Sequence, residues 1–358
     1  MTRPIHGGNL AWAATIAKCL PAEILDFSAS INPLGPPESI LGAIQSNLDK
    51  IRAYPDPQYG ELRKALSLFH KISPDWILPG NGAAELLTWA AFDLAGLAVT
   101  YILTPAFHDY QRALSTFQVK VQECPFIFAK NQCIFPDFSS WQIKNDEPAG
   151  IILNNPHNPT GSLIEKDTIL SLLDKFQLVV IDEAFMDFLP PDQSASFIDQ
   201  IADYPHLIIV RSLTKFYSMP GLRLGYAIAH PDRIKQWQKW RDPWSVNVLA
   251  IEAGKALIND QKFAEKTWTW LTTARTELFN NLQNIPGLTP LPSVANFLLV
   301  ASDQSVEYLQ LQLLTKYQIL IRDCASFPLL GDQYFRIAVR TKEENMRLIN
   351  ALQEIIMP

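Results

Sequence analysis

The chain has 358 residues, of which 48% are hydrophobic and 18% are charged. A single hydrophobic core stops growing beyond roughly 250–300 residues, so the sequence predicts two lobes. The formal net charge is -6 and lysine and arginine are not clustered, which argues against nucleic acid and anionic membranes as partners. The four cysteines lack metal-binding spacing, so we expect a cytoplasmic protein with reduced thiols, no metal site and no signal peptide.

Residues 1–35 are predicted to be largely irregular. The stretch 25–35 predicts a short strand followed by a turn, and Pro36-Pro37 precedes a predicted helix over 38–50. Tyr54-Pro-Asp-Pro57 predicts a rigid, extended connector before a helix over 61–70. We expect residues 1–45 to form an N-terminal segment that packs on the C-terminal domain.

Short apolar strands and helices then alternate along the chain. The expected strands are 76–79, 99–104, 120–123, 150–154, 179–182, 207–211 and 222–229, and the expected helices are 83–95, 108–117 and 165–175. This alternation predicts an α/β fold, with a mostly parallel sheet covered by helices on both faces. Residues 46–245 are predicted to form this large domain.

The C-terminal part has a different order of elements. From about residue 243 a long helix is expected to lead into a smaller α+β domain, residues 246–358. Its predicted strands are 296–301, 319–322 and 334–340.

The most informative stretch is 211–225, with the sequence Arg-Ser-Leu-Thr-Lys-Phe-Tyr-Ser-Met-Pro-Gly-Leu-Arg-Leu-Gly. The amine of Lys215 can form a Schiff base with an aldehyde. The hydroxyls of Ser212 and Thr214 and the guanidinium of Arg223 can hold a phosphate beside it. This combination indicates pyridoxal phosphate as the cofactor. Taken alone, the segment is also compatible with a surface lysine and a salt-bridge arginine.

Three further motifs follow predicted strands, where ligands of such sheets bind. The turn Asn155-Pro-His-Asn-Pro-Thr-Gly161 can aim Asn158 at a ligand, although it is also ordinary turn chemistry. Asp182 ends an apolar strand and needs a cationic partner such as a protonated pyridine nitrogen; a helix N-cap is the alternative. The amides of Gly82, Ala83 and Ala84 open a helix, where a phosphate can bind.

The order Asn158, Asp182, Lys215 and Arg223 resembles the fold-type I pyridoxal-phosphate enzymes of the class I/II aminotransferase group, over nearly the whole chain. In that group the asparagine bonds the phenolic oxygen of the cofactor and the aspartate pairs with its ring nitrogen. The lysine carries the cofactor covalently, and the arginine holds its phosphate. The resemblance makes Lys215 and Asp182 the expected catalytic residues.

The same resemblance implies two aromatic contacts. Phe107 is expected to stack on the cofactor ring. Tyr54 is expected to reach the cofactor phosphate of a neighbouring subunit, which implies a homodimer with shared active sites.

Within the group, the chain is similar to the histidinol-phosphate aminotransferases and, more closely, to the threonine-phosphate decarboxylases. The second resemblance rests on the blocks 6–9, 25–35, 211–217, 243–247 and 319–324. It implies decarboxylation of L-threonine O-3-phosphate to (R)-1-amino-2-propanol O-2-phosphate for cobalamin, with serine phosphate as an open alternative. The expected substrate-binding residues are His6, Asn32, Arg322, Arg336 and Arg340. Ordinary salt bridges are the alternative role of the arginines.

Two positions depart from the pattern of the aminotransferases. Phe185 stands where these commonly carry a tyrosine that bonds the cofactor, which resembles the decarboxylase pattern. His157 stands where asparagine is commoner, and the sequence assigns it no role. The alternative function is that of an aminotransferase that acts on histidinol phosphate.

Overall fold

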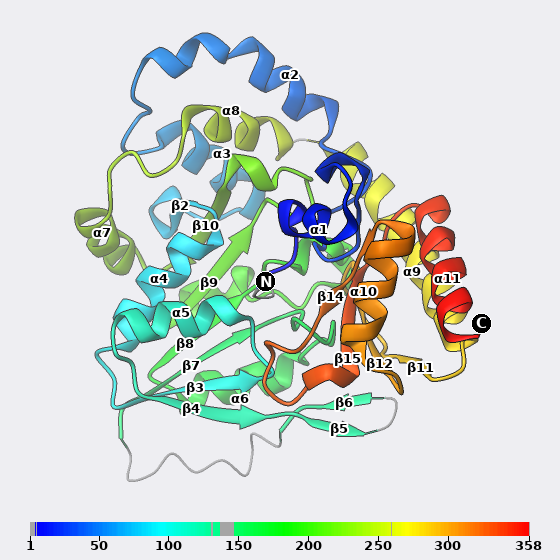
Figure 1. Cartoon of the computed structure of the whole chain (residues 1–358). Coiled ribbons are helices and arrows are strands. Elements are labelled where there is room, and N and C mark those ends of the chain that lie inside the picture. Colours follow the sequence, from blue (N-terminus) through cyan, green and yellow to red (C-terminus); the bar gives the residue numbers. More distant parts are fainter. Residues whose placement is uncertain (1–3, 5, 130–131, 137–146, 259, 358) are drawn as a thin grey trace.

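A seven-stranded sheet forms the centre of the larger lobe in the computed structural model, which describes residues 4, 6–129, 132–136, 147–258 and 260–357 (Figure 1). The strands of this sheet are β2 (Ile77–Asn81), β3 (Val99–Thr104), β4 (Val121–Pro125), β7 (Ala149–Asn154), β8 (Leu178–Asp182), β9 (Leu207–Ser212) and β10 (Leu224–Ala229). Their order is β2-β10-β9-β8-β7-β3-β4. Strand β10 runs antiparallel to both of its neighbours, β2 and β9, and all pairs from β9 to β4 are parallel, which confirms the predicted mostly parallel α/β architecture.

The central strands are apolar throughout because helices cover both faces of the sheet. Alternate residues point to opposite faces: Ile152 and Val180 pack with one cluster, and Ile151 and Val179 with the other. The first cluster includes α4 (Ala83–Leu94), α5 (His108–Thr116) and α7 (Pro231–Trp240). The second includes α3 (Gly60–His70), α6 (Lys166–Lys175) and α8 (Val248–Leu257).

The smaller lobe is built on a four-stranded sheet, to the right in Figure 1. Its order is β11 (Leu288–Pro290), β12 (Phe297–Ser302), β15 (Tyr334–Ala338) and β14 (Arg322–Asp323). Three helices belong to it, namely α9 (Gln261–Gln283), α10 (Val306–Tyr317) and α11 (Lys342–Ile356). A capping box fixes the start of α11, because Thr341 and Glu344 each bond the backbone amide of the other.

The N-terminal segment lies against this smaller lobe. Strand β1 (Leu25–Asp26) pairs in parallel with β13 (Ile319–Leu320), and α1 (Leu10–Ala17) contacts α10. The strand pairing holds one end of residues 26–32 on the smaller lobe. The backbone amide of Asn32 donates to the carbonyl of Lys215 at 3.0 Å, so these residues lie between the two lobes.

Several element predictions were wrong. Residues 1–35, expected to be irregular, contain helix α1, and the strand expected over 319–322 is two strands, β13 and β14. The helix expected over 38–50 ends as α2 at Ser46, and a separate 3₁₀ turn follows over Leu48–Arg52. The single long helix expected from residue 243 is two helices, α8 and α9. Helix α7 was not predicted at all. The boundaries at 45 and 245 stay predictions, although α8 contacts α2 and α3 of the larger lobe.

The remaining elements are short. They are the hairpin β5 (Ile127–Ala129) and β6 (Gln132–Ile134), and 3₁₀ turns at Pro21–Glu23, Pro74–Trp76, Met186–Phe188, Pro191–Gln193, Ile198–Asp203, Pro220–Leu222 and Gly331–Gln333. All four cysteines are free thiols. Within the described ranges, every helix is too short or too polar to cross a membrane.

Candidate active site

The carboxyl ends of three adjacent parallel strands bring the predicted catalytic residues together. Asp182 ends β8 and pairs in register with Asn154, the last residue of β7 before the turn that carries Asn158. On its other side Asp182 pairs with Val210 of β9, two residues before Ser212. The three polar motifs therefore meet at one edge of the sheet, as expected for an α/β ligand site.

Asp182 is the buried anion of the site. Its side chain is 5% exposed. One carboxylate oxygen accepts a hydrogen bond from the Tyr110 hydroxyl at 2.8 Å, and the other accepts one from the Ala184 amide at 2.9 Å. Burial raises the pKa of Asp182, while the nearby Lys215 amine and these hydrogen bonds act in the opposite direction. A cationic ligand beside this carboxylate would stabilise its charged form.

Lys215 lies close to Asp182, three residues after the end of β9. Burial lowers the pKa of the Lys215 amine, and the positive charges of Arg336 and Arg223 lower it further. Its Nζ atom is 4.9 Å from the centroid of the Phe185 ring. A larger fraction of this amine is therefore neutral, and so nucleophilic, than for a lysine in water.

The residues predicted to hold a phosphate also meet. Gly82 precedes α4 with φ of +74°, and a Cβ atom there would come within 2.5 Å of Nη2 of Arg223. Gly225 pairs with both Ser212 and Gly80, which aligns the three segments. The Ser212 and Thr214 hydroxyls are 2.8 Å apart. The result is a cradle of amides, hydroxyls and a guanidinium at a helix N-terminus, which suits a phosphate.

Phe107, His6 and Tyr54 lie at the margins of the larger lobe. Phe107 precedes α5, and its ring centroid is 6.0 Å from that of His6. Burial and the charges of His108 and Arg322 lower the pKa of His6. The Tyr54 side chain is 79% exposed, with its ring centroid 4.6 Å from that of Trp244.

Two arginines of the smaller lobe face the site. Arg322 of β14 and Arg336 of β15 are direct cross-strand partners, and both are buried. Arg336 donates to the side-chain oxygen of Asn158 and, at 3.1 Å, to the carbonyl of Ser28. Burial lowers the pKa of Arg336 to about 10. Arg322 donates to the Ser326 hydroxyl at 2.6 Å.

Arg340 and Asn32 bond with the protein itself. Arg340 donates to the carbonyl of Asp26 at 3.0 Å and forms an ion pair with Glu344 at 2.8 Å. The side-chain amide of Asn32 donates to the carbonyl of Phe216 and to the Thr267 hydroxyl, at 2.9 Å each. Both side chains therefore tie the N-terminal segment to its neighbours. Their predicted contacts with a substrate stay predictions.

The sequence prediction missed Tyr110, which lies three residues after Phe107 on α5. Residues three apart share a helix face, so this spacing was the available signal. The structure also gives His157 a place. Its Nδ1 is 2.8 Å from the Thr160 hydroxyl, its ring centroid is 4.4 Å from that of Phe126, and burial lowers its pKa to about 3. His157 is thus a neutral core residue of the Asn158 turn.

The buried Asp182, the amine of Lys215 and the anion cradle fit the ring nitrogen, the aldehyde and the phosphate of pyridoxal phosphate. Together with the sheet order, they define a fold-type I pyridoxal-phosphate enzyme. The sequence matches the family model described as "Aminotransferase class I and II" over residues 22–352. The chain therefore belongs to the class I and II aminotransferase family, and pyridoxal phosphate is its cofactor.

Three similar proteins show which members of this family the chain resembles. The chain is 37% identical to threonine-phosphate decarboxylase of Salmonella typhimurium, over 98% of this chain and 96% of that protein. It is 33% identical to the adenosylcobalamin biosynthesis bifunctional protein CobDQ of Leptospira interrogans, over 99% of this chain and 41% of that protein. Histidinol-phosphate aminotransferase of Clostridium acetobutylicum superposes with a TM-score of 0.86 at 29% identity, covering 93% of this chain and 99% of that chain.

Proposed function

We propose that this protein decarboxylates L-threonine O-3-phosphate to (R)-1-amino-2-propanol O-2-phosphate, for the side chain of cobalamin. The single observation that carries this proposal is the buried cross-strand pair of Arg322 and Arg336 beside the Lys215 site. Like charges directly opposite on neighbouring strands are destabilising unless an anion lies between or beside them. A substrate with both a carboxylate and a phosphate supplies two such anions.

The similar proteins support the same choice. The chain covers nearly all of the Salmonella threonine-phosphate decarboxylase, at 37% identity. The Leptospira relative bears a name from adenosylcobalamin biosynthesis, although this chain matches only 41% of it. Cobalamin as the destination of the product rests on this name and on the family resemblance.

The proposed roles of the cofactor-binding residues follow the family pattern. Lys215 binds the cofactor covalently, Asp182 pairs with its ring nitrogen and Asn158 bonds its phenolic oxygen. The proposed phosphate ligands are Gly82, Ala83, Ala84, Ser212, Thr214 and Arg223, with Tyr54 from the partner subunit. Phe107 covers the ring. The buried position of Asp182 supports its role, because a buried carboxylate needs a positive partner.

The arginines of the smaller lobe choose the reaction by orienting the substrate. Pyridoxal phosphate, when bound, withdraws electrons from the bond at the substrate Cα that is perpendicular to the cofactor ring. Arg336 and Arg322 would hold the carboxylate and the phosphate so that the bond from Cα to the carboxylate takes that position. Arg336 is suited to this task because its Nε is buried without a hydrogen-bond partner among the described residues.

Lys215 would then supply the proton that replaces carbon dioxide. Carbon dioxide leaves with its two oxygens and leaves the bonding electrons behind, so no acid or base is needed for that step. Cα must afterwards gain one proton. The Lys215 ammonium can donate it, and its lowered pKa makes the donation easier.

The rival function is an aminotransferase that acts on histidinol phosphate. The structural likeness to the Clostridium enzyme favours it, with a TM-score of 0.86. Phe185 favours the decarboxylase, because it cannot donate a hydrogen bond to the cofactor. Its ring packs edge-on against Phe297 at 4.9 Å, which leaves an apolar wall beside Lys215.

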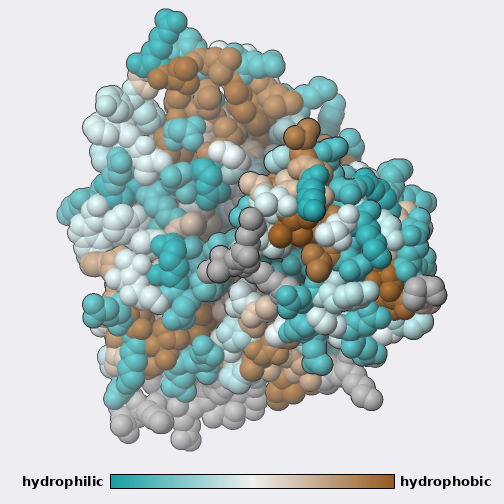
Figure 2. Space-filling model, viewed as in Figure 1, coloured by the Kyte–Doolittle hydropathy of each residue, from teal (hydrophilic) through white to brown (hydrophobic). Residues whose placement is uncertain are grey.

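We also propose a homodimer with shared active sites, in the cytoplasm. Exposed apolar side chains gather over α2 and α8, at the top of Figure 2. They include Leu41, Leu48, Ile51 and Trp244, and Tyr54 lies beside Trp244. A partner subunit on this face would bury these side chains, and Tyr54 would then reach the active site of that partner. The four free thiols are consistent with a reducing compartment.

The deciding experiment measures carbon dioxide release by the purified holoenzyme from L-threonine O-3-phosphate, with and without 2-oxoglutarate. Release that needs no oxoacid, with one aminopropanol phosphate per carbon dioxide, is the expected result. Lys215→Ala should abolish both release and the covalent attachment of the cofactor. Glutamate formation with histidinol phosphate as donor, and no carbon dioxide release, would instead assign the protein to the aminotransferases. L-serine O-3-phosphate in a parallel assay tests the choice of amino acid.

A further inference from the structure

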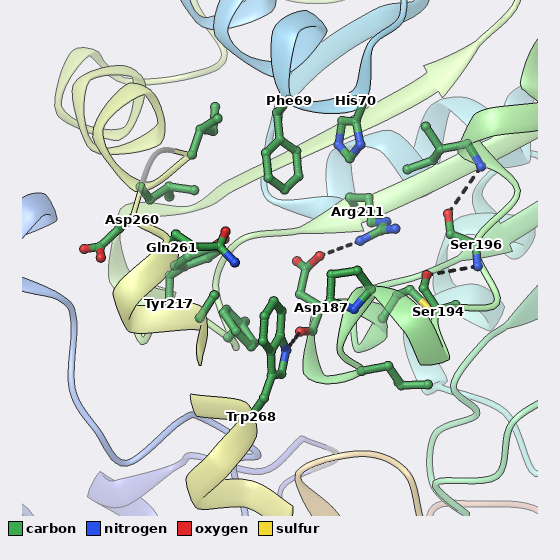
Figure 3. A pocket seen from close by; sticks show the side chains of 18 of the residues that line it. Phe69, His70, Asp187, Ser194, Ser196, Arg211, Tyr217, Asp260, Gln261 and Trp268 are labelled. Carbon is green, nitrogen blue, oxygen red and sulfur yellow. Dashed lines mark hydrogen bonds and ion pairs between the residues drawn. The ribbon is translucent and has the colours of Figure 1, made fainter. Parts of the chain in front are cut away.

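A cavity lies where α3 and α8 of the larger lobe meet α9 of the smaller lobe (Figure 3). Its volume is about 330 Å³, which is enough for a small molecule. The residues that line this α3–α9 cavity include none of those expected to bind the cofactor or the substrate. Phe216 and Tyr217, which directly follow Lys215, form part of its wall.

The wall of the α3–α9 cavity carries an excess of negative charge. Its charged lining residues are Lys166, Arg211, Asp187, Asp199 and Asp260. Arg211 is also bonded to the buried carboxylate of Glu183, at 2.7 Å. One guanidinium thus serves two carboxylates, that of the buried Glu183 and that of the partly exposed Asp187. Two ionised carboxylates and one guanidinium carry one net negative charge, and burial raises the pKa of both carboxyl groups, so a second cation would stabilise their charged forms.

Asp187 presents this charge to the cavity. One of its carboxylate oxygens accepts a hydrogen bond from Arg211, and in the described part of the chain no donor bonds the other oxygen. The side chain is 17% exposed. In Figure 3 it points from its 3₁₀ turn into the middle of the cavity, between Arg211 and Trp268. His70 does not supply the missing cation, because burial lowers its pKa to about 3.

Four aromatic rings are among the other residues that line the cavity. Phe69, Tyr217, Phe216 and Trp268 all line the cavity, and the indole of Trp268 is fixed by a hydrogen bond of 2.8 Å to the carbonyl of Asp187. Aromatic faces attract ammonium groups, most strongly where the group is removed from water. A carboxylate surrounded by aromatic rings is therefore a receptor for an organic cation.

We propose that the α3–α9 cavity binds a small organic cation, an ammonium group with an apolar body, at a site separate from the Lys215 site. The cation neutralises the charge that Arg211 leaves on Asp187 and Glu183, and its apolar part covers the aromatic wall. Because Phe216 and Tyr217 belong to the segment that carries Lys215, an occupant contacts that segment from behind.

Choline is a suitable probe, because it has no primary amine and so cannot condense with the cofactor. Its neutral isostere is 3,3-dimethylbutan-1-ol, which has the same shape without the charge. Isothermal titration of the holoenzyme should give saturable binding of choline, one per chain, and at least about tenfold weaker binding of the isostere. Equal affinities for the two, or no heat from choline at millimolar concentration, would overturn the proposal.

Two variants locate the site. Asp187→Asn keeps an acceptor for Arg211, leaves it paired with Glu183, and should weaken choline about tenfold or more without changing the isostere. Phe69→Ala removes a ring that is 49% exposed, so the fold is expected to tolerate it. Leu68→Ala is the matched control, since Leu68 is the neighbouring exposed residue of α3 and does not line the cavity. Choline affinity that is unchanged by Phe69→Ala, or lowered equally by Leu68→Ala, would refute this location.

Discussion

Removing the hydroxyl of Tyr110 should lower the affinity for pyridoxal phosphate, because Asp182 loses a hydrogen-bond donor. In Tyr110→Phe the ring and its packing stay, and the only loss is the hydrogen bond of 2.8 Å to the Asp182 carboxylate. A hydrogen bond to a charged group contributes about 1.5–3 kcal/mol, which corresponds to roughly 10- to 150-fold in an equilibrium constant. The pKa of Asp182, already raised by burial, should rise further, because its charged form loses a donor.

The assay is a titration of the apoenzyme with pyridoxal phosphate as a function of pH, together with kcat/KM. We expect the affinity and kcat/KM to fall by about this factor, and the acid limb of the affinity profile to move to higher pH. Tyr59→Phe is the control, because it removes another buried tyrosine hydroxyl, which donates to the Pro243 carbonyl at 2.7 Å. It should lower the free energy of unfolding without changing cofactor affinity. Wild-type affinity and an unshifted profile in Tyr110→Phe would refute the reasoning.

Three other changes give separate tests. Gly82→Ala should lower cofactor affinity by displacing the nearby guanidinium, whereas Gly221→Ala, with open space around it, should not; equal affinities in equilibrium dialysis would contradict this. Arg336→Ala should raise KM for the phosphorylated substrate far more than the cofactor dissociation constant, and equal losses would place Arg336 in the cofactor site or in the fold. The lowered pKa of His70, about 3, means that stability is lost as pH falls from 6.5 towards 3, at up to about 1.4 kcal/mol per pH unit. Urea unfolding of His70→Gln should therefore depend less steeply on pH than wild type, and equal slopes would argue against it.

Most strands of the larger lobe could be predicted because they are apolar runs that end at polar or turn residues. The run 99–104 was predicted at both ends, and the run 179–182 to within one residue. The helices after residue 230 were harder to predict. The break between α8 and α9 has no proline or glycine to announce it, and Asp260 caps α9 by accepting a hydrogen bond from the Phe263 amide at 3.1 Å. An aspartate at this position is a helix start signal, which the prediction of one long helix did not use.

The positions of the site residues could be predicted further than their partners. Asn158, Asp182 and Lys215 each follow a strand, and parallel strands necessarily bring such positions to one edge. The sequence could not predict whether a charged side chain has a partner within the protein. Arg340 is an example, because the Asp26 carbonyl that it bonds is 314 residues away in the chain.

The cross-strand arginines connect the fold to the choice of substrate. Two unit charges about 6 Å apart repel each other by roughly 3 kcal/mol at an effective dielectric constant of about 20. Arg322 has a carboxylate nearby, that of Asp323 at 3.7 Å, but Arg336 forms no ion pair in the described part of the chain. Arg336 instead bonds Asn158, a residue proposed to bind the cofactor. An anion that binds Arg336 would reduce the repulsion between the two arginines. It would also free Asn158 from its hydrogen bond with Arg336. The hydrogen bond between Arg336 and Asn158 would then couple substrate binding in the smaller lobe to the cofactor in the larger one. This coupling gives a reason for the contact between the two lobes at Arg336 and Asn158.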